Sequence, residues 1–150
     1  MSRKKDLPFI DYINLGPWPG FVGFTTSAES FAKELARICP DADVPFLASG
    51  RAGASTHTFD DETCMTQIVT ICPQGDHSNE AYAAMIAHEA MHVVQHMRQE
   101  YCASHHKEGL GIEAEAYLCQ YLVQEMLAIA WQTGRIKSRQ PSKRRKKNGN

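Results

Sequence analysis

The chain has 150 residues, of which 43% are hydrophobic and 22% are charged. This composition is that of a soluble globular protein, and the length suits one domain rather than two. No apolar run approaches the roughly 20 residues that cross a bilayer, so we expect no membrane partner. Polar residues and prolines follow the basic start, so no signal peptide is predicted and the cytoplasm is the expected location.

Charge is divided unevenly along the chain. From Arg135 onward the sequence holds 8 of the 16 Lys and Arg residues and no acid, whereas residues 1–134 carry the other 8 bases against all 17 acids. We therefore expect one domain over residues 1–136, followed by a basic, disordered tail over residues 137–150. This tail can contact nucleic-acid phosphates in a salt-dependent way, but it has no interleaved aromatic residues to stack on bases.

The N-terminal part of the chain predicts an arm and one helix. Residues 1–25 are rich in proline and glycine, and we expect an irregular arm anchored by aromatic side chains. Residues 26–29, Thr-Ser-Ala-Glu, match a capping box at the start of a helix. Apolar residues then recur on one face of this helix, and Pro40 ends it.

The middle of the chain predicts strands. Residues 65–72 are rich in β-branched residues that alternate with Thr and Gln, which predicts a strand, and residues 44–48 predict a shorter one. Residues 49–56 are rich in Gly and Ser, but they lack the lysine and the spacing of a phosphate-binding loop. We expect them to form a plain connector.

Two helices complete the prediction. The first should run from about residue 79 to residue 97 or slightly beyond, with Asp76, Ser78 or Asn79 as its cap. The second is strongly apolar, runs from about residue 112 to 132, and has Gly134 as a suitable C-terminal cap. Strands and helices together predict a small α+β domain.

The first of these helices carries a histidine motif, His88-Glu89-x-x-His92. Positions four apart share a helix face at about 5–6 Å, so the two imidazoles can bind one metal ion. Glu89 can reach a water beside the ion without binding the ion itself. His96 lies about 12 Å from His88 along the helix, too far to share a zinc ion, and is expected on the rim or surface. The five cysteines form no C-x-x-C pair, so a cysteine zinc site is not expected.

A third ligand must come from elsewhere, because a catalytic zinc ion takes three protein ligands and a water. The last helix opens with Glu113 and Glu115, which lie on different faces of it. Alanines beside them allow a close approach to the first helix. Both acids also suit an ordinary helix start, where the dipole favours negative charge. From the residues alone, either glutamate can be the ligand.

HExxH followed by Glu-x-x-Ala on a second helix resembles the gluzincin metallopeptidases, in particular the small minigluzincins of phages and mobile elements. The resemblance covers about residues 65–130. It implies a zincin-like fold, in which a short antiparallel sheet packs on the HExxH helix and a C-terminal helix bears the glutamate. It also implies one Zn²⁺ held by His88, His92 and Glu113, with Glu89 as general base in hydrolysis of a protein or peptide substrate. Tyr117 departs from the Asp or Asn that several of these families carry after the alanine.

The residues allow more than one candidate for the oxyanion donor, the substrate-binding edge and the class of function. The donor that stabilises the oxyanion can be any of Tyr117, Tyr101, His105 and His106. If the strand over residues 65–72 is an open edge, it can bind an extended peptide through backbone hydrogen bonds. The alternative to a peptidase is a non-catalytic metal-binding module whose basic tail contacts nucleic acid.

Overall fold

A computed structural model describes residues 7–60, 64–73, 75–105 and 111–134. The elements within these residues form a small mixed α+β domain, as the sequence predicts. In chain order they are β1 (Asp11–Ile13), β2 (Phe21–Thr25), α1 (Ala28–Ile38), β3 (Ala54–Asp60), β4 (Met65–Ile71), α2 (Asn79–His105) and α3 (Ile112–Gln132). No helix among the described residues is long and apolar enough to cross a bilayer.

The four strands form one mixed sheet in the order β1-β2-β4-β3. β1 pairs with β2 and β3 pairs with β4 in antiparallel fashion, but β2 and β4 run parallel. The prediction of a purely antiparallel sheet is therefore wrong. A parallel pair needs a long crossover, and here that crossover contains α1 and β3. The strand predicted over residues 65–72 exists as β4 but lies inside the sheet, so the open edge beside it is β3 instead.

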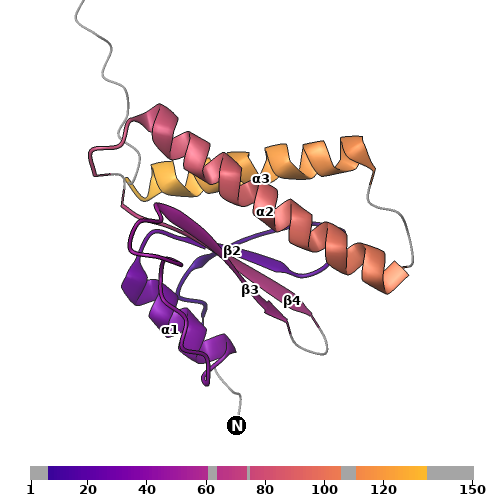
Figure 1. Ribbon diagram of the computed structural model, residues 1–150, viewed down its shortest axis with the longest axis horizontal. Coiled ribbons are helices and arrows are strands. Elements are labelled where there is room, and N and C mark those ends of the chain that lie inside the picture. The colour runs from indigo at the N-terminus through magenta and orange to yellow at the C-terminus, as the bar shows by residue number, and fades with distance from the viewer. Residues whose placement is uncertain (1–6, 61–63, 74, 106–110, 135–150) are drawn as a thin grey trace, which may run out of the picture.

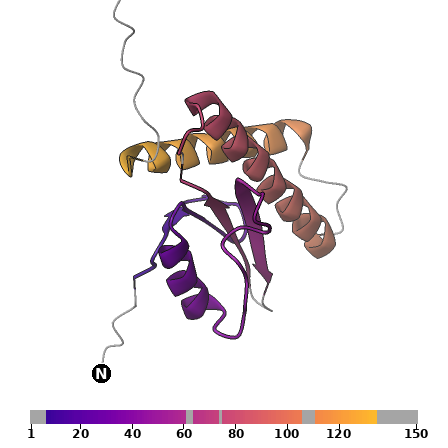
Figure 2. The same cartoon turned by 60° about the vertical axis from the view of Figure 1, so that its left-hand side comes forward.

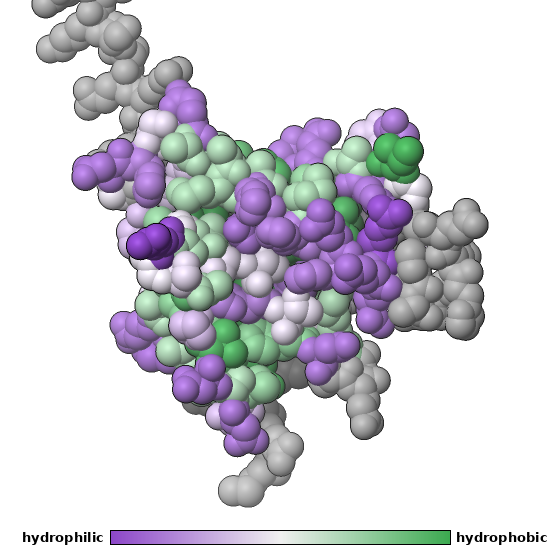
Figure 3. Space-filling view, in the orientation of Figure 1, coloured by the Kyte–Doolittle hydropathy of each residue, from purple (hydrophilic) through white to green (hydrophobic). Residues whose placement is uncertain are grey.

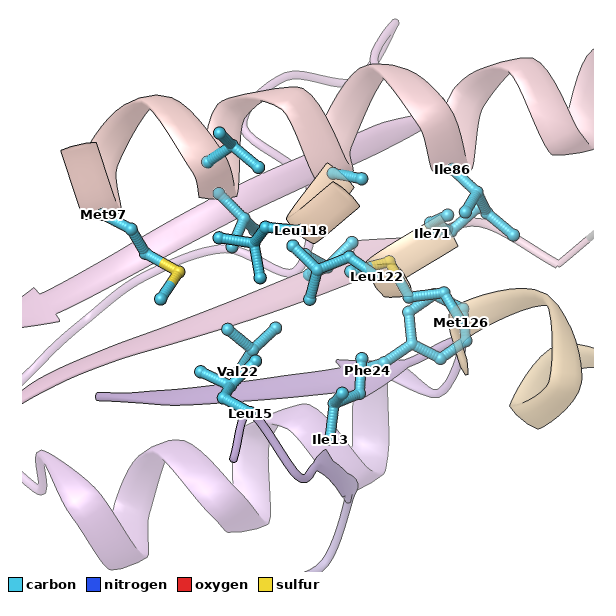
Figure 4. Close-up of a cluster of buried hydrophobic side chains, with 14 of the residues drawn as sticks. Ile13, Leu15, Val22, Phe24, Ile71, Ile86, Met97, Leu118, Leu122 and Met126 are labelled. Atoms are coloured by element: carbon cyan, nitrogen blue, oxygen red, sulfur yellow. The ribbon is translucent and has the colours of Figure 1, made fainter. Parts of the chain in front are cut away.

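The sheet separates two apolar cores. Figures 1 and 2 show α1 on one face of the sheet and α2 with α3 on the other. The larger core lies under α2 and α3, where Ile86 and Met97 from α2 meet Leu118 and Leu122 from α3 above Phe24 (Figure 4). Phe31 and Leu35 of α1 pack with Ile68 on the other face. Helices thus cover both faces of the sheet, and α2 packs over β3 and β4.

The helices follow local signals closely. The side chain of Ser27 accepts a hydrogen bond from Ser30 N and caps α1, one residue later than the predicted box starts. α1 ends at Ile38, two residues before Pro40. α3 has the predicted bounds, whereas α2 runs eight residues beyond the predicted Met97, to His105.

The strands were harder to predict. Residues 11–13 and 21–25 form β1 and β2 inside the expected irregular arm, and β3 occupies part of the expected connector. β3 is mostly polar on both faces, so its pairing with β4 rather than an apolar pattern makes it a strand. Residues 44–48 form no strand. Instead the Phe46 carbonyl accepts a hydrogen bond from the Thr70 hydroxyl of β4, so a side chain joins this segment to the sheet.

Candidate metal centre

Helix α2 brings His88 and His92 together. Their Nε2 atoms lie 3.1 Å apart and their ring centroids 4.7 Å apart. Two nitrogens that bind one tetrahedral zinc ion at about 2.0–2.1 Å lie roughly 3.4 Å from each other. The pair therefore has nearly the spacing that one shared ion requires. His88 is exposed and His92 is half-buried, so an ion can reach the pair from solvent.

A neighbouring side chain orients His92. Its Nδ1 lies 3.3 Å from the Gln95 carbonyl oxygen Oε1, one turn further along α2. A proton on Nδ1 can be donated to that oxygen, which leaves the lone pair on Nε2, facing His88. Histidines that bind metals generally donate their other ring N–H to an oxygen in this way.

Glu89 turns from the histidine pair toward the sheet. Only 5% of the residue is exposed, and its Oε2 accepts a hydrogen bond of 2.7 Å from the Thr56 hydroxyl of β3. No described Lys, Arg or His forms an ion pair with this carboxylate. A buried carboxylate without a cationic partner is costly, so a cation bound at the adjacent histidines would offset that cost.

A groove of about 400 Å³ lies between α2 and the start of β3, and we call it the α2–β3 groove. It is lined by Gly53, Ala54, Ala81, Ala84, Met85, His88 and Glu89. Gly53 keeps it open, because a Cβ there would lie 2.6 Å from the Met85 sulfur. Figure 3 shows hydrophilic side chains along the outer side of α2. His88 and Glu89 of the motif thus line a groove beside the start of β3, which is an edge strand among the described residues.

His96 does not join the pair, in agreement with the distance argument. Its Nδ1 lies 2.7 Å from the Thr58 hydroxyl and 3.2 Å from Gln67 Oε1. The histidine stripe therefore divides into a pair that meets nitrogen to nitrogen and a third ring held against the sheet.

The predicted third ligand forms no three-residue group with the histidine pair among the described residues. Glu113 is exposed in the first turn of α3, and Glu115 Oε1 lies 3.5 Å from Arg98 Nε. At 100° per residue, Arg98 projects from α2 about 120° away from His92, so α3 begins on another side of α2. Among the described residues, no group of three His, Cys, Asp or Glu side chains is close enough to hold an ion.

Two of the four candidates for the oxyanion donor lie within the described residues. Tyr117 is exposed and lines a separate hollow with Trp18, against α3. Tyr101 is half-buried near the end of α2. The side chain of His105 and all of His106 lie outside the described residues. The sequence did not predict the hydrogen bond from Thr56 to Glu89, because β3 has only a weak strand pattern.

Comparison with known proteins found no related protein. No protein-family model matches the chain, and no curated protein or solved structure matches it either.

Proposed function

We propose that this protein is a zinc-dependent metallopeptidase whose centre is built on His88 and His92, with Glu89 as general base. The observation that carries the proposal is the approach of the two Nε2 atoms to 3.1 Å beside a buried carboxylate that has no cationic partner among the described residues. A structural histidine pair has no need of such a carboxylate. A metal-assisted hydrolase needs both.

Each side chain has a defined task in this proposal. His88 and His92 would hold the ion through Nε2, and a bound zinc ion would supply a Lewis acid and a more acidic water. Thr56 holds Oε2 of Glu89, and we assign Oε1 to the attacking water. Glu89 takes the proton of that water and then delivers it to the leaving amine.

The edge strand β3 supports a peptide as the substrate. Among the described residues β3 pairs with β4 alone and is the edge strand of the sheet, and its first residue lines the α2–β3 groove. An extended peptide can add to this edge as a further strand, with main-chain hydrogen bonds that require no particular side chains. Such a peptide would pass over the histidine motif, because Thr56 of β3 contacts Glu89.

The proposal is tested by metal content and peptide hydrolysis in one set of variants. Wild-type protein should retain one equivalent of zinc after dialysis and cleave a mixed peptide library. His88→Ala and His92→Ala should lose both properties, whereas His77→Ala, an exposed histidine before α2, should lose neither. Full zinc content in His88→Ala would overturn the proposed centre.

The third ligand remains a proposal from the family resemblance. If Glu113 completes the centre, the first turn of α3 has to shift relative to α2 when the ion binds. Glu113→Ala should then bind zinc more weakly, and Glu115→Ala should not. Equal affinity in wild type and Glu113→Ala would leave the two histidines with solvent or substrate as the remaining ligands.

A further inference from the structure

A fully buried amide holds His96. Gln67 in β4 has no exposed surface, and its Nε2 donates to the Val93 carbonyl at 3.3 Å. This bond fixes the orientation of the amide, because a carbonyl can only accept. Gln67 Oε1 therefore faces His96 Nδ1, at 3.2 Å, and the Thr58 hydroxyl lies 2.7 Å from the same nitrogen.

These contacts select one tautomer of His96. An amide oxygen only accepts, so a lone pair on Nδ1 would face the lone pairs of Gln67 Oε1. A proton on Nδ1 removes that repulsion and can be shared between Oε1 and the Thr58 oxygen. In the neutral ring Nε2 then carries the lone pair, on the side of the ring away from the buried amide.

His96 lies on the path that the proposed substrate would take. It follows His92 by one turn, about 6 Å along α2 and about 40° around it. The contacts of Glu89 with Thr56 and of His96 with Thr58 show that α2 and β3 run alongside each other here. A peptide strand on the edge of β3 would project alternate side chains toward α2. One of them would meet His96 beyond the histidine pair.

We propose that His96, which lies further along α2 than the groove, is a specificity residue and accepts, through Nε2, a hydrogen bond from a substrate side chain that carries a donor, such as Thr or Ser. This proposal rests on the peptidase function above. The Gln67 amide and the Thr58 hydroxyl act through His96, because these side chains set its tautomer. A purely structural network between α2 and the sheet would use the same contacts but would give Nε2 no role.

The test compares peptides that differ only by Thr or Val, scanned position by position. At one position, wild-type protein should prefer Thr by about 5- to 10-fold in kcat/KM, with the difference in KM, because one hydrogen bond is lost with Val. His96→Asn keeps an amide near the Nδ1 position but lacks Nε2, and it should lose the preference. His96→Gln reaches the Nε2 position and should restore part of it. The same Thr preference should appear in the Kd values of Glu89→Gln, which requires no turnover.

A second readout is independent of turnover. Long-range ¹⁵N–¹H correlation spectra of histidine-labelled protein should show the His96 proton on Nδ1. A proton on Nε2, or an unchanged Thr preference in His96→Asn, overturns the proposal while hydrolysis stands. If neither wild-type protein nor any variant hydrolyses or binds any of the peptides, the proposed peptidase function is overturned, and this inference with it.

Discussion

Two buried glutamates on opposite faces of the sheet have very different surroundings. Glu34 of α1 is fully buried, and its carboxylate accepts hydrogen bonds of 2.9 Å from Phe9 N and from the Tyr12 hydroxyl. It also accepts from the guanidinium of Arg37 and forms an ion pair with it. Glu89 of α2 is almost as deeply buried, but the only side chain that donates to it among the described residues is the neutral Thr56.

The difference distinguishes a carboxylate with a full set of partners from the one that we propose as the general base. Burial by itself would raise the pKa of Glu34, but the hydrogen bonds from Arg37, Phe9 N and Tyr12 together lower it. Burial and the Glu34 carboxylate in turn raise the pKa of Tyr12. This network is complete and needs no ligand, so it ties the N-terminal arm to α1. Glu89 forms no ion pair with a described Lys, Arg or His, and it follows His88, whose Nε2 lies 3.1 Å from that of His92.

The largest expected effect is the difference in peptide hydrolysis between Glu89→Gln and Glu34→Gln. Glu89→Gln should lower peptide hydrolysis by about 10²- to 10⁴-fold, because the general base is lost. Its zinc content should stay at the wild-type level, because Glu89 does not hold the ion. Glu34→Gln is the matched control and should keep most of the activity per folded molecule. Wild-type turnover in Glu89→Gln would remove the distinction.

For stability we expect the opposite of the result for activity: Glu34→Gln should have the larger effect. In zinc-free protein, Glu34→Gln should lower the free energy of unfolding by about 2 kcal/mol, because charge-assisted hydrogen bonds are lost. Glu89→Gln should leave the free energy of unfolding unchanged or raise it, since a neutral amide costs less to bury than an unpaired carboxylate. Urea unfolding of both variants measures this. Equal destabilisation by both substitutions would show that Glu89 is structural too.

A pH titration sharpens the same contrast. Because the folded-state pKa of Glu34 is lowered, its stabilisation is complete above the ordinary glutamate pKa of about 4.3. It is lost as the pH falls from there through the lowered native pKa. Urea midpoints measured from about pH 6 down to about pH 3 should therefore fall less steeply for Glu34→Gln than for wild type. Parallel curves would contradict the assigned pKa shift.

The smallest effect concerns the hydroxyl that holds Glu89. Thr56→Val keeps the shape of the side chain but removes the donor, so the free energy of unfolding should fall by about 1 kcal/mol. Activity should fall by less than in Glu89→Gln, because the carboxylate is still present but less well oriented. The control is Thr66→Val, at a position whose side chain faces the hollow beside α1. An activity loss as large as that of Glu89→Gln would assign Thr56 a more direct role.

Features that depend on neighbours in the chain could be read from the sequence. The bounds of α3, the start of α2 and the end of α1 follow from helical periodicity and capping residues, which act within one or two turns. The approach of His88 to His92 follows from their i, i+4 spacing in the same way, and so does the exclusion of His96. A helix brings such residues together whatever surrounds it.

Only the tertiary structure decided the features that depend on distant parts of the chain. β3 became a strand because β4 pairs with it, and β2 lies parallel to β4 because α1 returns the chain across one face of the sheet. The burial of Glu89 against Thr56 and the contact of Glu115 with Arg98 come from this packing. Strand pairing and helix docking join residues that are tens of positions apart, and local periodicity carries no information about which partners meet.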